Sequence, residues 1–370
     1  MELVLPEHIK FSQSLAAPID VNLSDSCAQG VTLGELIELS GGKMPDIELG
    51  YNPIAGSEGL KAAIKAYHLP TTVCVDLNQI VTFNGAQEAI FTTMAQLLEP
   101  QDEVVVCTPS YPSLATLPKQ FGAIVNTVPL REENNWQFDI ERLKNAVTTN
   151  TKLIIVNAPH NPTGTGLTDN EVGQIQQLAE QCGAYILSDE VSAQSHGDDR
   201  AVSGRFSAYP RSITLGVLSK SMGLPGIRVG WAICGSKALA NALLAGKSYL
   251  SICGSKVDDL LATTALLHSE TILAHNASII ANNVQLIREF VSLYSQKVTW
   301  VEPHGGVLSL LKINSVRDSE KWSRQFAETS NTLLLPAKLF LLESECHFRL
   351  GTGKRNFAAG LVRLETYLSD

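Results

Sequence analysis

The chain has 370 residues, of which 44% are hydrophobic and 18% charged, so it can bury a large core and exceeds the usual length of one simple layered domain. Its formal net charge of −9, without any cluster of lysine and arginine, argues against nucleic acid and against an anionic membrane as partners. We therefore expect one large and one smaller domain, and small molecules as partners.

The first residues and the cysteines bear on location. Met1–Glu7 contain neither a basic nor an apolar region of a signal peptide, and no stretch of about 18 apolar residues occurs. The seven cysteines are odd in number and widely spaced, without a CxxC pair, which argues against a disulfide framework and against a zinc site. We predict a soluble, cytoplasmic protein without a metal, in which most cysteines are reduced and buried.

Short apolar runs rich in β-branched residues recur in the first two thirds of the chain and predict strands. In chain order they are Glu103–Thr108, Ala123–Val128, Lys152–Asn157, Ala184–Ser188, Ile213–Leu218 and Val229–Cys234. Helical patterns such as Gln87–Leu98 and Asp169–Gln181 lie between several of them. Strands that are apolar on both faces and alternate with helices are typical of a mostly parallel sheet, so we predict an α/β domain over residues 46–250.

Beyond about residue 245 the pattern changes to that of a second domain. Helical patterns cover Leu260–His268 and Ala277–Tyr294, and strand-like pieces follow around Gly306–Leu311 and Thr332–Pro336. The first 45 residues show little periodicity, and we expect them to pack on the C-terminal part beside the functional site. We therefore predict a smaller α+β domain formed by residues 1–45 and 251–370.

The segment Phe83–Ala89 changes from a strand to a helix at Gly85. Backbone N–H groups at the start of a helix are free to bind an anion, and the helix dipole favours negative charge there. The segment therefore indicates a candidate phosphate site at Gly85, Ala86 and Gln87.

The segment Leu218–Trp231 follows an apolar strand, and its glycines and proline form a tight loop in which Lys220 stands among uncharged neighbours. Burial of such an amine lowers its pKa, which favours the free base that forms imines. Arg228, further along the loop, is suited to binding a phosphate through two hydrogen bonds. A glycine-rich loop with a solvated lysine is the alternative.

Two carboxylates, Asp189 and Glu190, end the buried run Ile186–Val191. An unpaired charge is costly in such a place, so one of them requires a cationic partner. We interpret Glu190 as an exposed loop acid.

Asn157–Gly164 reads NAPHNPTG and resembles the NxPxNPTG turn of the class I/II aminotransferases, which are fold type I enzymes dependent on pyridoxal 5′-phosphate (PLP). The glycine turn, the Asp-Glu pair and the lysine loop resemble the same family, whose hallmarks extend here from Tyr51 to Arg349. The resemblance implies PLP as cofactor and the α/β PLP-dependent transferase fold of type I. That fold has a mostly parallel central sheet with helices on both faces and a smaller α+β domain.

The resemblance also implies a role for each matching residue. Lys220 would hold the cofactor as a Schiff base, Asp189 would pair with the pyridinium nitrogen and keep the ring an electron sink, and Asn161 would hydrogen-bond its 3′-oxygen. The implied phosphate cradle consists of Gly85, Ala86, Gln87, Ser219 and Arg228.

Three further positions resemble the family. The turn Thr108–Tyr111 resembles one that lays an aromatic ring, here Tyr111, over the pyridine face, with a core tyrosine as the alternative. Tyr51 matches a tyrosine that reaches the phosphate of the neighbouring subunit, which implies a homodimer with shared sites. Arg349 matches the arginine that binds the α-carboxylate of an amino acid substrate, beside Asn161. A surface arginine on an edge strand is the alternative for Arg349.

The sequence departs from the family at two positions. Val217 stands three residues before the lysine, where the family often has serine or threonine, which puts one hydroxyl contact in doubt. Ser192 stands three residues after Asp189, where aminotransferases carry a tyrosine that also holds the 3′-oxygen. We predict that Ser192 still binds the cofactor. Because serine is shorter than tyrosine, we expect the imine to be tuned differently and more space to be left beside the reacting carbons.

The segment Asn22–Leu36 resembles the N-terminal segment of capreomycidine synthase-like members, which also lack that tyrosine, and we place Asp25 among the substrate-binding residues. Those members remove Cα–H from a hydroxylated arginine, expel the hydroxyl and add a guanidine nitrogen to the unsaturated intermediate. We favour such a cyclisation, giving a product such as capreomycidine or enduracididine. Amino transfer to a 2-oxo acid is the alternative. A PLP-binding regulator is disfavoured, because no additional DNA-binding domain is present.

Overall fold

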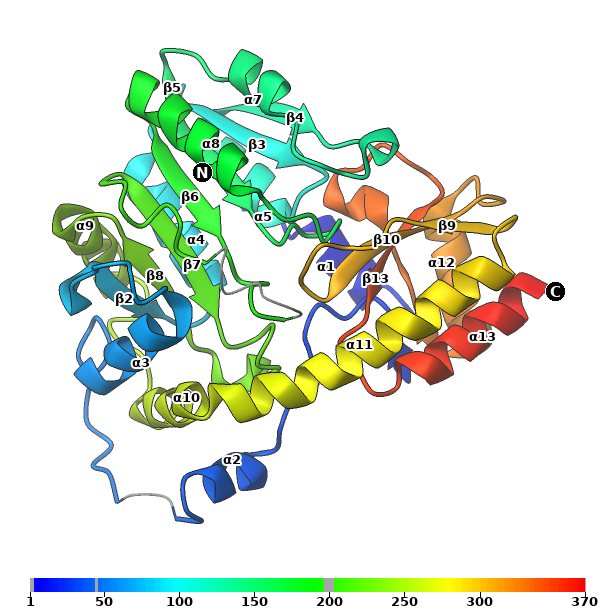
Figure 1. The fold of residues 1–370 in the computed structure, drawn as a ribbon, viewed down its shortest axis with the longest axis horizontal. Coiled ribbons are helices and arrows are strands. Elements are labelled where there is room, and N and C mark those ends of the chain that lie inside the picture. Colours follow the sequence, from blue (N-terminus) through cyan, green and yellow to red (C-terminus); the bar gives the residue numbers. More distant parts are fainter. Residues whose placement is uncertain (1–2, 44–45, 196–202, 370) are drawn as a thin grey trace.

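The computed structural model describes residues 3–43, 46–195 and 203–369. A seven-stranded sheet with the order β2-β8-β7-β6-β5-β3-β4 forms its centre (Figure 1). Neighbouring strands are parallel except at β8, which runs antiparallel to both β2 and β7, so the predicted mostly parallel sheet is confirmed. The strands are β2 (Ile80–Phe83), β3 (Glu103–Thr108), β4 (Ile124–Pro129), β5 (Thr151–Asn157), β6 (Tyr185–Asp189), β7 (Ser212–Val217) and β8 (Gly230–Cys234).

Side chains of these strands alternate between two hydrophobic layers. In β5, Leu153 and Ile155 belong to one layer, while Ile154 and Val156 belong to the other. Burial on both faces is the reason that the strands have continuous apolar sequences. The first layer is covered by α4 (Ala86–Leu97), α5 (Pro112–Ala115), α6 (Leu117–Gln120) and α9 (Lys237–Ser248), the second by α7 (Ile140–Ala146) and α8 (Asp169–Cys182).

A second sheet has the order β12-β13-β10-β9 and is antiparallel throughout. It packs with helices around a separate core that contains Phe326, Phe348 and Leu364. The long helix α11 extends from α10 to this second sheet (Figure 1). These elements are α11 (Ser269–Leu293), β9 (Val298–Trp300), β10 (Leu308–Ile313), α12 (Ser319–Ser330), β12 (Leu335–Pro336), β13 (His347–Gly351) and α13 (Phe357–Ser369).

The N-terminal elements divide between the two parts. Helix α1 (Glu7–Gln13) packs through Phe11 on the short helix η5 (Ala337–Phe340), and β1 (Val21–Asn22) pairs with β11 (Thr332–Leu333). These contacts lie on the C-terminal part. In contrast, α2 (Leu33–Leu39) places Leu36 in a core shared with α3 (Glu58–His68) and α10 (Lys256–Leu267). Short 3₁₀ turns are η1 (Leu77–Gln79), η2 (Glu132–Asn134) and η4 (Pro225–Ile227).

The domain boundaries at residues 45 and 250 stay predictions. The first falls at residues 44–45, which lie outside the described residues. The helix after the second boundary, α10, packs on α3 and shares a core with β2 and β8 of the large sheet.

Two predictions from composition concern cysteines and membranes. All seven cysteines are free, but only Cys107 and Cys234 are buried, so the prediction that most are buried is wrong. Of the helices in the described part of the chain, none is long and apolar enough to cross a membrane.

Candidate active site

The carboxyl ends of the parallel strands β5, β6 and β7 meet at one edge of the large sheet, the usual place for a ligand in such a fold. Asn157 ends β5, Asp189 ends β6, and Lys220 follows closely after β7. A cavity of about 210 Å³ lies there. It is lined by Cys27, Gly85, Ala86, Gln87, Ile90, Tyr111, Asn157, Asn161, Asp189, Val191, Val217, Ser219, Lys220, Pro225 and Arg228.

Lys220 lies in this cavity beneath a segment from the N-terminus. Its Nζ donates a hydrogen bond of 2.6 Å to Ser26 Oγ, and its carbonyl accepts one from the Ala28 N–H. Burial lowers the pKa of the Lys220 amine. The lysine is therefore held in place and shifted toward the nucleophilic free base, and the solvated-lysine alternative does not hold.

An anion-binding cradle forms at the start of α4. Gly85 has a φ of +85°, and a Cβ there would collide with the guanidinium of Arg228. No side chain caps α4, so the N–H groups of Ala86 and Gln87 have no partner within the helix. Arg228 is aimed by hydrogen bonds to the carbonyls of Pro225 (2.9 Å) and Asn84 (3.3 Å). Free N–H groups, a helix dipole and a guanidinium together favour a phosphate.

Asp189 is a buried acid at the end of β6, only 2% exposed. Its Oδ1 accepts a hydrogen bond of 3.2 Å from the Val191 N–H, and it forms no ion pair with any described residue. Burial raises the pKa of this carboxyl to about 6. A cationic group in the cavity would relieve that cost of burial.

Arg349 is a buried cation on β13. Its Nη2 donates to the Ser24 carbonyl at 2.9 Å and its Nη1 to Asn161 Oδ1 at 3.4 Å, while Nε is buried without a partner in the described chain. The guanidinium carbon lies 4.2 Å from the centre of the Phe340 ring. Burial lowers the pKa of Arg349 to about 10. Since β13 lies between β10 and β12, the surface-arginine alternative is wrong. The unsatisfied guanidinium fits a carboxylate.

Tyr111 forms part of the cavity wall at the start of α5. Its hydroxyl donates a hydrogen bond of 3.1 Å to Gln87 Oε1, and burial raises its pKa. Tyr111 therefore faces the cavity and contacts Gln87 of the cradle. This position is compatible with a ring that lies over a bound cofactor.

Four predicted residues do not line the cavity, one of which is Arg349, described above. Tyr51 is 83% exposed. Ser192 is buried beside Gly306. If Gly306 carried a Cβ, that atom would lie 3.5 Å from the Cβ of Ser192. Asp25 is partly exposed, accepts a hydrogen bond of 2.8 Å from the Cys27 N–H, and lies 3.7 Å from Lys354 Nζ.

The model of the family "Aminotransferase class I and II" matches residues 43–356 of the chain. The chain belongs to this family. Pyridoxal phosphate is therefore its cofactor. The residues present fit that group: the cradle at Gly85 and Arg228 suits the phosphate, Asp189 suits a protonated ring nitrogen, and Lys220 suits the aldehyde carbon.

Relatives of this aminotransferase-family enzyme include a synthase and aminotransferases. Capreomycidine synthase of Streptomyces vinaceus is 28% identical over 86% of this chain and 82% of its own length. Aspartate aminotransferase of Thermotoga maritima is 27% identical over 79% and 76%.

Solved structures show the same fold. A PLP-dependent aminotransferase from Streptococcus suis matches with a TM-score of 0.92 at 29% identity, covering 100% of this chain and 98% of its own. The PLP-dependent cyclase OrfR matches with a TM-score of 0.88 at 26% identity, with the same coverage of both chains. The predicted fold type I architecture is thus confirmed.

Sequence reasoning missed several residues of the aminotransferase-family site. Ser26 and Cys27 lie in the segment Asn22–Leu36, but no local signal in the sequence shows that they contact the lysine loop or the cavity.

The interpretation of Glu190 as an exposed acid is wrong. It is buried and accepts hydrogen bonds from His68 Nε2 (3.0 Å), Ser188 Oγ (2.8 Å) and the Gly204 N–H (2.7 Å).

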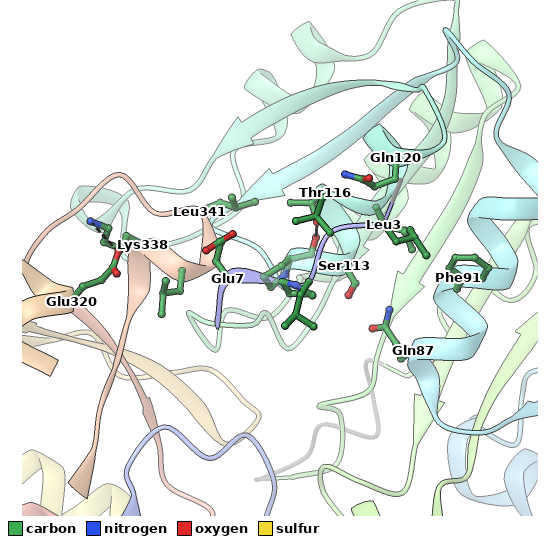
Figure 2. A pocket seen from close by; sticks show the side chains of 16 residues that line it. Leu3, Glu7, Gln87, Phe91, Ser113, Thr116, Gln120, Glu320, Lys338 and Leu341 are labelled. Atoms are coloured by element: carbon green, nitrogen blue, oxygen red, sulfur yellow. Dashed lines mark hydrogen bonds and ion pairs between the residues drawn. The ribbon is translucent and has the colours of Figure 1, made fainter. Parts of the chain in front are cut away.

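A second, larger hollow of about 840 Å³ adjoins the cavity and shares Gln87 with it. Figure 2 shows the N-terminal segment with Leu3 and Glu7 crossing this hollow, with Gln87 and Phe91 on one side and Lys338 on the other. The N-terminal segment therefore borders the site from outside the cradle.

Proposed function

We propose that this PLP-dependent enzyme eliminates water from a hydroxylated arginine and cyclises it to a guanidino amino acid such as capreomycidine or enduracididine. The observation that carries the proposal is the position of Ser24–Cys27. This segment resembles its counterpart in capreomycidine synthase-like enzymes, and it contacts Arg349 through Ser24 and Lys220 through Ser26. Ser192 and the similarity to capreomycidine synthase and the cyclase OrfR support the same reaction.

In this proposal Arg349 binds the α-carboxylate of the substrate through two parallel hydrogen bonds. Its contact with Asn161 fixes the guanidinium beside the cofactor, and the stack on Phe340 holds its plane. The α-amino group and Cα then face Lys220.

Lys220 takes the proton from Cα and later returns it. Its lowered pKa favours the neutral amine that this step requires, and Ser26 Oγ orients that amine. When bound, PLP supplies the electron sink that stabilises the carbanion left behind. Asp189, a buried carboxylate, maintains the positive charge of the ring nitrogen.

The proton balance of the cyclisation closes without another reactant. The hydroxyl of the substrate leaves together with one proton as water, and a guanidine nitrogen that loses one N–H proton forms the new C–N bond. The Cα proton is restored at the end, so the net change is the loss of one water. Asp25 contributes a negative charge that acts on both Lys220 and Arg349, and we assign it to the cationic side chain of the substrate.

The proposal includes a cytoplasmic homodimer in which Tyr51 reaches the phosphate site of the partner subunit. Tyr51 projects from its own subunit, as a residue acting in the partner would. The seven free cysteines fit a reducing compartment.

Amino transfer to a 2-oxo acid is the second candidate, favoured by the aminotransferases among the relatives. Mass analysis of products from β- and γ-hydroxyarginine, with and without a 2-oxo acid, separates the two reactions. Cyclisation predicts a product lighter by one water that forms without the acceptor. An oxo acid product that requires the acceptor for turnover, with no dehydrated product, would refute the cyclase proposal.

A further inference from the structure

His8, close to the N-terminus, lies beside the candidate active site although no sequence motif marks it. It belongs to α1, which Phe11 anchors on η5. Its ring centre is 5.9 Å from that of Tyr111 and 5.5 Å from that of Phe340. Phe340 in turn carries the Arg349 guanidinium 4.2 Å from its ring centre. His8 therefore connects the aromatic wall of the cavity with the aromatic support of the candidate carboxylate-binding arginine.

The imidazole of His8 has an unused hydrogen-bonding atom. Nδ1 is buried and has no hydrogen-bond partner among the residues that the structure describes. Buried polar atoms are nearly always paired, so an unpaired one beside a ligand cavity points to a ligand atom as its partner. Burial, followed by the positive charges of Arg349 and Lys220, lowers the pKa of His8 to about 4. The ring is therefore neutral near pH 7 and has one nitrogen free to accept a hydrogen bond.

We infer that His8 contacts the side chain of the substrate, with Nδ1 accepting a hydrogen bond from a guanidine N–H. The inference rests on the proposed function, because it takes the substrate to be an arginine derivative. A guanidinium group carries only donors, which a neutral imidazole matches and a second cation would repel. Asp25 offsets the charge of the side chain, while the rigid ring of His8 fixes its direction.

Two substitutions separate this contact from packing. His8→Phe keeps a flat ring against Tyr111 and Phe340 but removes the acceptor, whereas His8→Asn places an amide near the position of Nδ1. Both are made in the PLP-loaded Lys220→Ala enzyme, which prevents turnover. Calorimetry then measures the Kd of arginine and of norleucine, an apolar analogue without the guanidine group. Thermal melting and the cofactor content of each variant control for folding.

His8→Phe should weaken arginine binding about tenfold and norleucine binding less than about twofold, and His8→Asn should restore most of the loss. Equal weakening of both ligands would reduce His8 to a packing residue and overturn the inference. A preference for arginine that survives in His8→Phe would also overturn it, while leaving the proposed function intact. If the parent enzyme binds arginine no better than norleucine, the proposed substrate class fails, and the inference fails with it.

Discussion

Three ionisable residues, the buried Asp189 and Arg349 and the partly buried Lys220, define the chemistry at the scale of single side chains. Burial is the largest cause that shifts each pKa toward the neutral form, and none of the three forms an ion pair with another described residue. Charged side chains in such unfavourable positions are typical of functional sites, where ligand groups of opposite charge offset the cost of burial. The cofactor and an amino acid carry the complementary charges.

Asp189 makes the stability of the apoenzyme depend on pH. Its folded pKa of about 6 lies above the ordinary value of 3.8, so its contribution is complete below pH 4 and is lost as pH rises through 6. Relative to Asp189→Asn, the wild-type apoenzyme should lose roughly 3 kcal/mol of unfolding free energy between pH 4 and pH 7. Urea unfolding of both proteins across this range measures the difference. Parallel profiles would show that Asp189 is not an unpaired buried acid.

Arg349→Lys keeps the positive charge but loses the planar pair of donors. The KM of the amino acid substrate should rise at least about tenfold, because the paired contact with the α-carboxylate is lost. The affinity for PLP should stay unchanged, because the phosphate cradle at Gly85 and Arg228 is left intact. Arg355→Lys is the matched control, since Arg355 is an exposed arginine nearby in the chain. Steady-state kinetics and cofactor titration test both variants, and an unchanged KM in Arg349→Lys would remove Arg349 from substrate binding.

At the scale of elements, two helices hold the segment that follows Tyr51. Lys247 of α9 is fully buried and donates hydrogen bonds of 2.6 Å to the carbonyls of Ile54 and Thr82. Asp259 of α10 accepts hydrogen bonds from the Asn52 side chain and from both the N–H and the hydroxyl of Ser57. Buried groups of opposite charge thus fix the segment from two sides.

Lys247→Met keeps the length of the side chain but leaves two carbonyls without their donor. The unfolding free energy should fall by about 2 to 3 kcal/mol, the cost of leaving buried polar groups unpaired. Lys237→Met, at an exposed position of the same helix, should have no measurable effect. Denaturant unfolding compares the two variants. Equal stability of Lys247→Met and the wild type would mean that the hydrogen bonds of Lys247 contribute nothing to the unfolding free energy.

Local sequence was sufficient for the main strands, because their apolar runs are bounded by glycine and polar residues. The predicted Glu103–Thr108 has the bounds of β3, and the other predicted strands of the large sheet differ from the observed ones by at most one residue at each end. The predicted Gly306–Leu311 begins and ends two residues before β10, and the predicted Thr332–Pro336 covers both β11 and β12. The short helices α1 and α2 were not predicted. Each is anchored by one buried side chain of its own, Phe11 or Leu36, which packs on an element distant in the sequence. Glu190 was misassigned for the same reason, because its partner His68 lies 122 residues away.

At the scale of the whole molecule, the site combines both sheets and the N-terminal segment. Arg349 from the second sheet reaches Asn161 beside the first, and Ser26 reaches Lys220 across 194 residues of sequence. The family motifs identified most of the residues that line the cavity. They could not identify Ser26 or His8, because only the packed fold brings these residues to the site.

A shared site in a dimer predicts complementation between inactive subunits. Tyr51→Ala removes the residue acting in the partner, and Lys220→Ala removes the one acting in its own subunit. Mixed dimers contain one intact site, so an equal mixture should recover roughly a quarter of the wild-type activity. Native mass spectrometry verifies that the subunits exchange. Exchanged but inactive mixtures would contradict a role for Tyr51 across the interface.

The fate of the α-nitrogen distinguishes cyclisation from amino transfer in a single experiment. The enzyme is given hydroxyarginine labelled with ¹⁵N at the α-amino group, together with pyruvate as an acceptor, and mass spectrometry follows the label. A cyclase retains the α-amino group, so cyclisation predicts ¹⁵N in a product lighter than the substrate by one water, and no ¹⁵N in alanine. Transfer of the label into alanine, with no labelled dehydrated product, would contradict the account and identify an aminotransferase.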